Sequence, residues 1–301
     1  MKKNASEAIE PAKPRRNKSA AQSVKTVIDE GNDGSSSDTA AGPDALITVA
    51  RTMRIIELLA DSEVGMSVTE IARHLDVNKN LAFRIVTSLL ALRYLRQDRE
   101  TLAYKLTYKI SNLGLRKLAT GRFLSECFPI LHTLAEKTGE HTRLAVIEDG
   151  IPIWVHSETG KQWGLMIDSV YSHELSYHAH ATAKAWLATL PEARVREIIG
   201  PSPFVAYTPY TITSRDQFLD DLKTCRAQGF AISYEERELG VATLAAPIMA
   251  RNASGEIECV GVVSMAAPTP RMDRERFIAC APDVISTAEH LAEVWPTRAN
   301  T

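Results

Sequence analysis

The sequence contains no run of apolar residues long enough to span a bilayer, and its cysteines are few and scattered. Because a membrane-spanning helix needs about 20 consecutive apolar residues, a transmembrane helix is excluded. The four cysteines form no CxxC pair, which argues against both a disulfide framework and a zinc finger. The basic residues Lys2 and Lys3 are not followed by an apolar stretch, so we expect no secretory signal. These absences favour a protein of the reducing cytoplasm.

Motifs that mark common catalytic sites are also missing. The chain has no G-x-S-x-G elbow, no phosphate-binding P-loop and no G-x-G-x-x-G dinucleotide motif. Glu235 and Glu236 could form an acid/base pair, but adjacent carboxylates on a strand point to opposite faces. We therefore expect a protein that is not an enzyme and that needs no cofactor.

A histidine-rich segment raises the question of a bound metal. His-x-His on a strand directs two imidazoles to one side, and with a nearby glutamate the candidate ligands are His173, Glu174, His178 and His180. No cysteine lies close by, and the spacing matches no common structural metal site. We expect no metal here.

The net charge of −2 conceals a strong asymmetry along the 301 residues. At roughly 100–200 residues per domain, this length predicts two domains. Residues 44–120 carry twelve Lys and Arg against eight Asp and Glu, a net charge of +4, whereas residues 121–301 carry sixteen against twenty-three, a net charge of −7. A basic module is therefore joined to an acidic one, which suggests that one part alone binds a polyanion.

Residues 1–43 are rich in Ser, Ala, Lys, Asp and Gly and contain few large apolar side chains. Such a segment cannot bury enough surface to offset its chain entropy, so we expect a disordered tail. Two interpretations of it stay open: an additional DNA-seeking arm, or a solvated tail without a specific role.

Residues 44–107 show the pattern of a winged helix-turn-helix. A first helix has an expected buried face of Ile47, Val49, Met53, Ile56, Leu58 and Leu59. Ser67 and Glu70 form a capping box for a second helix that runs to Leu75. A turn at Asp76 follows, where Asp tolerates the left-handed conformation, and Asn78 can cap a third helix from Lys79 to about Leu92. Two β-like runs, 94–97 and 103–106, complete the layout as a hairpin.

In such a module the third helix enters the major groove and the hairpin wing contacts the backbone or minor groove. Asn80 and Arg84 can make bidentate contacts to adenine and guanine, while Lys79 suits a phosphate. Phe83 either packs on a thymine methyl or belongs to the core. The residues expected at DNA are Ser67, Thr69, Asn78, Lys79, Asn80, Phe83, Arg84, Thr87, Arg96 and Arg99.

The remainder of the chain predicts a linker and an α+β domain. Residues 108–138 are mostly helical, with Gly121 and Pro129 as expected interruptions, so we assign a linker helix to 108–122 and a second domain to 123–298. Strands are expected at 143–150, 151–158, 162–170, 231–234, 243–249 and 257–265, and helices at 181–190, 192–199, 216–228 and 273–294. A mostly antiparallel sheet with helices follows from this order.

From about residue 45 to 295 the chain resembles the IclR-type bacterial transcriptional regulators. The resemblance rests on SVTEIARHLDVNKNLAFRIVTSLLALRYL, TGEHTRLAVIEDG, HAHATAKAWLATLP, YTPYTITS, GFAISYEERELGVATLAAPI and GEIECVGVVSMAAP, in order and at the right spacing. It implies an N-terminal winged helix-turn-helix, a linker helix and a C-terminal α+β, GAF-like effector-binding domain. It also implies dimers or tetramers that bind a palindromic operator and respond to a small organic metabolite, often a carboxylate or an aromatic compound.

The resemblance also implies an effector pocket. In the family the turn that enters the first helix after the strands, here residues 178–184, presents amides to the effector's carboxylate, and Ala181 and Thr182 match those donors. The residues carried over to the pocket are Ile167, Leu175, His178, His180, Ala181, Thr182, Ser233, Glu235, Val241 and Thr243. Ser233 stands where the family usually has Asp, Thr243 where it usually has Cys, and His180 where a small residue is usual. The resulting pocket is less negative, which suits a more anionic or differently hydrogen-bonded effector.

Two functions from different classes fit these observations. One is a ligand-responsive regulator that binds double-stranded DNA. The other is a metabolite-binding protein whose helix-turn-helix makes protein contacts. Phosphate contacts would make DNA affinity fall steeply with salt, which separates the two.

Overall fold

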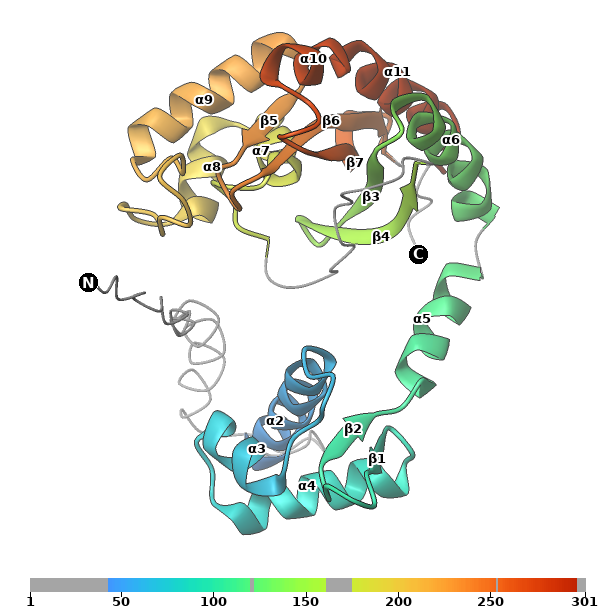
Figure 1. Ribbon diagram of the computed structural model, residues 1–301, viewed down its shortest axis with the longest axis vertical. Helices are drawn as coiled ribbons and strands as arrows, with labels where there is room; N and C mark the ends of the chain where they lie inside the picture. The colour runs from blue at the N-terminus through green and yellow to red at the C-terminus, as the bar shows by residue number, and fades with distance from the viewer. Residues whose placement is uncertain (1–42, 120–121, 161–174, 253, 297–301) are drawn as a thin grey trace, which may run out of the picture. The chain divides into compact units, whose positions relative to one another are not determined.

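The computed structural model describes residues 43–119, 122–160, 175–252 and 254–296 (Figure 1). The chain divides into two compact units, one ending at Gly114 and the other beginning at Leu115. The expected tail, apart from Pro43, and the strand expected at 162–170 lie outside the described residues. Within the described ranges, no helix is both long enough and apolar enough to cross a membrane.

The first unit has the predicted order of helix, helix, turn, helix and hairpin (Figure 1). Its elements are α2 (Pro43–Ala60), α3 (Val68–Leu75), α4 (Lys79–Ala91), β1 (Leu95–Gln97) and β2 (Tyr104–Leu106). The two strands pair antiparallel, with Arg96 opposite Lys105. Helix α5 (Lys109–Ala119) begins in this unit and continues past its boundary.

Local capping explains where α3 and α4 begin. The Ser67 hydroxyl accepts the Glu70 amide at 3.3 Å while the Glu70 carboxylate accepts the Ser67 amide at 2.8 Å, so the predicted capping box is confirmed. Asp76 ends α3 in the left-handed region at φ 54°, as predicted. Asn78 Oδ1 accepts the Leu81 amide at 2.9 Å and starts α4.

The expected buried face of α2 is partly wrong. Ile55 and Leu59 are buried against α3 and α4, but Val49 and Met53 are 60% and 50% exposed. Helical spacing alone could not distinguish the stripe that packs inside the unit from a second apolar stripe beside it.

The second unit is built on one antiparallel sheet with strand order β4-β3-β7-β6-β5. Its strands are β3 (His141–Glu148), β4 (Ile151–Thr159), β5 (Ala231–Tyr234), β6 (Val241–Arg251) and β7 (Ile257–Pro268). Its helices are α6 (Arg122–Thr138), α7 (Ala181–Leu187), α8 (Glu192–Ile199), α9 (Arg215–Gln228), α10 (Arg274–Ala279) and α11 (Ala281–Glu293).

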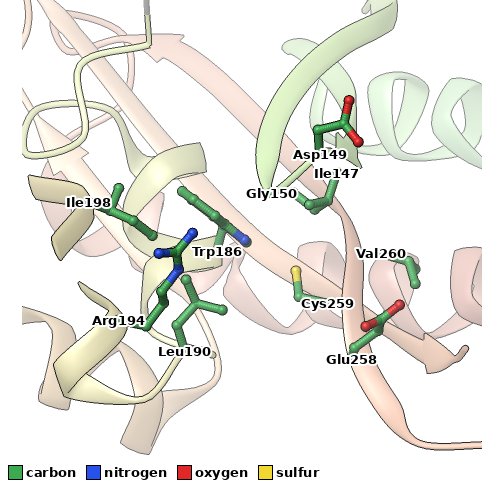
Figure 2. A pocket seen from close by; sticks show the side chains of 10 residues that line it. All are labelled: Ile147, Asp149, Gly150, Trp186, Leu190, Arg194, Ile198, Glu258, Cys259 and Val260. Carbon is green, nitrogen blue, oxygen red and sulfur yellow. The ribbon is translucent and has the colours of Figure 1, made fainter. Parts of the chain in front are cut away.

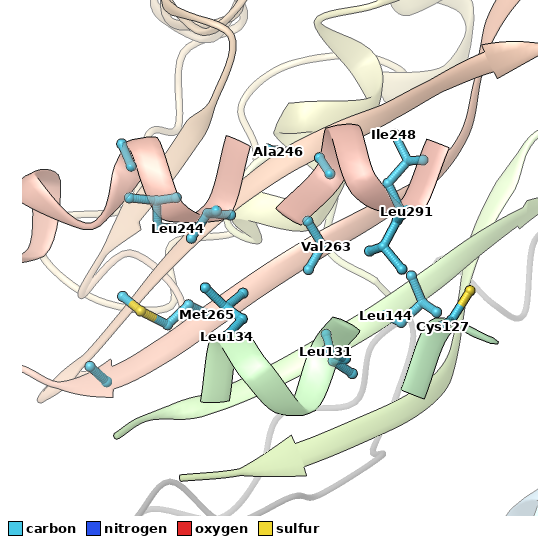
Figure 3. Packing of buried hydrophobic residues seen from close by; sticks show 14 of the residues in the cluster. Cys127, Leu131, Leu134, Leu144, Leu244, Ala246, Ile248, Val263, Met265 and Leu291 are labelled. Carbon is cyan, nitrogen blue, oxygen red and sulfur yellow. The ribbon is translucent and has the colours of Figure 1, made fainter. Parts of the chain in front are cut away.

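Strand alternation divides the core of this unit into two layers. Leu144 of β3 and Leu244 of β6 pack with α6, α10 and α11, and Figure 3 shows Leu131 and Leu291 of two of these helices among the same residues. Their strand neighbours, such as Ala145, pack with α7, α8 and α9 on the opposite face. The two layers together bury both faces of the sheet.

Two predicted helix boundaries differ from the structure. Pro129 lies inside the 17-residue α6 and does not interrupt it, because the helix continues without the one amide that proline lacks. The predicted helix over 273–294 is divided at Cys280 into α10 and α11. Pro282 is the second residue of α11, in the first turn, where a missing amide costs no intrahelical hydrogen bond.

Candidate functional sites

The surface of α4 that is turned away from the core carries the predicted DNA contacts. Lys79, Asn80, Arg84 and Thr87 are exposed, and Phe83 is 54% exposed, so its assignment to the core is wrong. The wing adds further exposed cations at Arg96 and Arg99, and Thr69 and Asn78 are exposed as well. Polar, apolar and basic side chains therefore share one exposed helix face, a combination of the kind that can read base edges in a major groove.

Two of these residues have side chains partly committed to local structure. The Ser67 hydroxyl donates to Glu70 Oε2 at 2.8 Å in addition to accepting the Glu70 amide. Both hydrogen bonds of the Ser67 hydroxyl are therefore made to Glu70, in the cap of α3. Asn78 uses Oδ1 for capping α4, which leaves its amide nitrogen as the group that can donate to a phosphate.

The second candidate site is formed on the face of the sheet that packs with α7. Arg143 of β3 pairs with Ser264 of β7, and Ser264 pairs in turn with Ala245 of β6. Because cross-strand partners share a face and Ala245 packs with α7, Arg143 lies on the α7 face. By the same alternation, Thr243 and its partner Ser233 lie there too.

The turn before α7 is tied to this sheet face. The Ser233 hydroxyl donates to the Ala179 carbonyl at 2.7 Å, which leaves its oxygen able to accept, so its place in the pocket stays a prediction. His178 Nε2 lies 2.8 Å from the Val205 carbonyl, and its ring stacks on Phe204. His178 is thus directed at a neighbouring loop and helps to hold the turn in place.

Of the predicted pocket residues, His180 is the one that lies beside side chains not predicted from the sequence. The Trp154 ring packs edge-on against it at 5.9 Å, and the Arg143 guanidinium lies 5.3 Å from the Trp154 ring. Burial, together with the nearby positive charges of Arg237 and Arg143, lowers the pKa of His180 to about 4. The imidazole is therefore neutral at neutral pH, beside a guanidinium that stays charged.

The remaining hydrogen bonds of this cluster favour an acidic ligand. Arg143 Nε donates to His141 Nε2 at 3.0 Å, and His141 Nδ1 lies 3.2 Å from Thr159 Oγ1. Trp154 Nε1 is buried and has no hydrogen-bond partner among the residues that the structure describes. An unpaired buried N–H donor next to a cation is a costly arrangement that an acceptor group on a ligand would relieve.

Arg143 and Trp154 are not among the residues predicted from the sequence. Strand alternation could have found Arg143, because Leu144 is an obvious core residue and its neighbour must face the other way. Trp154 had no such signal, since a register shift in the β3–β4 pair lies next to it and changes the alternation.

Glu235, which is predicted to line the pocket, makes hydrogen bonds within the domain. Its Oε1 accepts the Gly240 amide at 2.8 Å and the Thr269 hydroxyl at 3.0 Å. Both Glu235 and Glu236 follow the end of β5 and so do not lie on a strand as expected. The predicted Leu175, Val241 and Thr243 are partly buried, Ala181 and Thr182 are buried, and Ile167 lies outside the described residues.

Comparisons with known proteins agree with the geometry of both units. Residues 118–293 match the family model described as bacterial transcriptional regulator IclR C-terminal, and residues 48–99 match the IclR helix-turn-helix domain. The chain belongs to the IclR family of bacterial transcriptional regulators. It therefore combines a helix-turn-helix domain with the C-terminal effector domain of that family.

Curated members of the IclR family align with most of this chain. The HTH-type transcriptional regulator XynR of Escherichia coli K12 is 24% identical over 226 residues, which are 75% of this chain and 88% of XynR. BhcR of Paracoccus denitrificans is 28% identical over 243 residues, 80% of this chain and 85% of BhcR.

Solved IclR-family structures share the fold. The regulator from Alicyclobacillus acidocaldarius has a TM-score of 0.72 at 23% identity, covering 82% of this chain and 98% of that one. An IclR homologue from Microbacterium hydrocarbonoxydans, complexed with 4-hydroxybenzoate, has a TM-score of 0.64 at 19% identity over the same shares.

A separate pocket of this IclR-family chain, with a volume of about 380 Å³, lies where β3 ends and β7 begins (Figure 2). It is lined by Ile147, Asp149, Gly150, Trp186, Leu190, Arg194, Ile198, Glu258, Cys259 and Val260. None of the predicted effector residues that the structure describes borders it. Within the part of the chain that the structure describes, no cluster of three His, Cys, Asp or Glu suits a metal ion, and His173 and Glu174 lie outside that part.

Proposed function

We propose that this chain is a one-component regulator whose C-terminal domain binds a small organic acid that alters operator binding. The observation that carries the proposal is the cluster of Arg143, Trp154 and His180 on the α7 face, in a chain with an exposed basic recognition helix. The domains are assigned as a tail to residue 43, a winged helix over 44–107, a linker over 108–122 and an effector domain over 123–298.

The chemistry of the cluster supports a carboxylate with an aromatic or apolar body. Arg143 supplies a permanent positive charge, and Trp154 supplies a buried N–H donor that pairs with no described residue. The first residues of α7 are Ala181 and Thr182, and the side chain of the preceding His180 makes no capping hydrogen bond to this helix. The 4-hydroxybenzoate complex of a structural neighbour supports the same ligand class.

Operator binding by two copies is supported by the surface of α2. Leu46, Val49 and Met53 are spaced at i, i+3 and i+7 and are all at least half exposed. Such a stripe is typical of a helix that pairs with another helix. A second copy of the chain would cover it and would place two recognition helices on a palindromic site.

The DNA part of the proposal is tested with the purified chain and the DNA upstream of its own gene. Fluorescence anisotropy at increasing salt is expected to give a steep, linear fall of log affinity with log salt. No binding, or binding that salt does not change, would favour the alternative in which the helix-turn-helix makes protein contacts.

The effector part is tested by thermal shift against small aromatic and aliphatic acids, with 4-hydroxybenzoate as the first probe. A ligand that binds only the folded state raises the melting temperature by mass action. Arg143→Met and Thr182→Trp are expected to abolish the shift that an active acid produces, whereas Arg251→Met, at an exposed position of β6, should preserve it. If both site variants show the full ligand-induced rise in melting temperature, the effector binds at another site.

A further inference from the structure

The C-terminal end of the recognition helix α4 is closed in an unusual way. The Arg93 amide donates to the Leu90 carbonyl and the Tyr94 amide to the Leu89 carbonyl, both at 2.9 Å, which is the Schellman pattern. The left-handed position of this motif usually holds glycine, but here Arg93 occupies it at φ 61°. This helix end therefore needs support from elsewhere.

The support comes from the residues that lead into the linker helix α5. The three carbonyls that follow α4, at Leu92, Arg93 and Tyr94, all accept hydrogen bonds from Thr107 or Lys109. Lys109 Nζ donates to Leu92 at 2.7 Å, the Thr107 hydroxyl donates to Arg93 at 2.7 Å, and the Thr107 amide donates to Tyr94 at 2.9 Å. We call these five residues the α4–α5 joint.

The charge of Lys109 strengthens the joint in two further ways. The last turn of α4 contains no basic residue of its own, so Lys109 supplies the cation that a helix C-terminus favours. The Lys109 ammonium also lies 4.3 Å from the centre of the Tyr94 ring, within range of a cation–π interaction. The Thr107 hydroxyl in turn accepts the Lys109 amide at 3.3 Å, which fixes the first residue of α5.

Helix α5 extends the joint into the other unit. It is one continuous helix from Lys109 to Ala119, and the division between the two units falls inside it, after Gly114 (Figure 1). A displacement of its C-terminal half would therefore reach the joint along one hydrogen-bonded helix. None of the predicted DNA or effector contacts belongs to the joint.

We propose that Thr107 and Lys109 are positioning residues that couple the linker helix to the recognition helix, so that α5 and α4 change their arrangement together. This rests on the proposed function, because it requires an operator on α4 and a response in the effector domain. Coupling free energies are reciprocal: if α5 biases α4, DNA bound to α4 must bias α5 equally. Operator DNA can therefore serve as the probe, and the effector need not be known.

The experiment measures hydrogen–deuterium exchange of the full chain with and without DNA from upstream of its own gene. In the wild type, DNA is expected to slow exchange in peptides from α4 and also from α5. In Thr107→Val/Lys109→Met, α4 should still be protected by DNA while the protection of α5 is lost. The single variant Lys109→Arg keeps the positive charge and a hydrogen-bond donor at this position, so DNA should still slow exchange in α5.

Controls separate coupling from simpler roles. Lys117→Met removes the same charge near the other end of α5 and should leave the DNA-induced protection of α5 intact. If Lys109 instead contacts a phosphate, Lys109→Met will lower the slope of log affinity against log salt by about one and leave α5 protection unchanged, which overturns the proposal. Lys109→Met alone, at an exposed position, serves if the double variant does not fold.

The remaining outcomes are also decisive. Equal protection of α5 in the wild type and in Thr107→Val/Lys109→Met would show that the joint transmits nothing. Protection of α4 without any protection of α5 in the wild type would overturn the coupling while leaving DNA binding intact. Absence of any DNA-induced protection would instead refute the proposed function itself.

Discussion

Lys184 Nζ lies 2.6 Å from Glu236 Oε2, and the Lys184 side chain is fully buried. Asp221 Oδ2 is 3.0 Å from the same ammonium but has no hydrogen bond, so it contributes charge without favourable alignment. Lys184 also donates to the Ile232 carbonyl at 3.3 Å. The ammonium thereby fastens α7, which begins at the candidate effector site, to β5 and the loop that follows it.

Removing the ammonium is expected to destabilise the effector domain severely. Lys184→Met keeps most of the side-chain volume but leaves the Glu236 carboxylate buried without its partner, and breaking a buried pair in this way costs about 3–5 kcal/mol. Urea denaturation followed by circular dichroism measures the loss. A loss within about 0.5 kcal/mol, the range of ordinary surface substitutions, would contradict the role given to this pair.

The same variant should acquire a distinctive pH dependence. Burial raises the pKa of Glu236 above the usual 4.5 even with Lys184 beside it. A raised carboxyl pKa means that the folded state keeps a proton that the unfolded state has lost, so stability falls as pH rises through the folded-state pKa. Lys184→Met should make this fall larger between pH 4.5 and neutrality, and Lys184→Met/Glu236→Gln should abolish the added fall.

A buried neutral imidazole gives the opposite dependence on pH. Burial lowers the pKa of His180 from 6.5 to about 4, so the unfolded state binds a proton that the folded state does not. Stability is then complete above pH 6.5 and is lost as pH falls toward 4, by about 3 kcal/mol for this group alone. Denaturation at several pH values should show a shallower acid loss in His180→Gln. The pKa of His178 is lowered as well, chiefly by burial, so part of the loss remains in that variant.

A feature is predictable from the sequence when the residues whose interaction determines it lie close together along the chain. The cap of α3 involves Ser67 and Glu70, three residues apart, and it was predictable because capping is settled within one helical turn. Lys184 and Glu236 are 52 residues apart, and no local pattern indicates that a lysine in an alanine-rich helix will be buried against a carboxylate. Arg143 is an intermediate case, since alternation gives its face but not its neighbours.

The two kinds of predicted DNA contact should respond differently to substitution. Arg84→Ala is expected to cost about 1–3 kcal/mol of operator affinity and to relax the preference at one base pair, because a bidentate contact to guanine is lost. Arg99→Ala, on the exposed wing, should weaken all sequences alike and lower the salt slope by about one. Anisotropy with operator and scrambled DNA measures both effects. Identical responses of the two variants would remove the distinction between base and phosphate contacts.

The exposed stripe of α2 leads to a prediction about assembly. Val49→Glu and Met53→Glu place charges on a surface that is proposed to meet the same surface of a second copy, where two carboxylates would face each other without partners. Analytical ultracentrifugation should show a shift toward the 33.2 kDa monomer, together with weaker operator binding as the two half-sites become uncoupled. Leu239→Glu, at a residue of the effector domain that is 60% exposed, serves as the matched control and should leave assembly unchanged. A wild-type chain that is already monomeric, or variants that assemble as the wild type does, would rule out this stripe as the contact between copies.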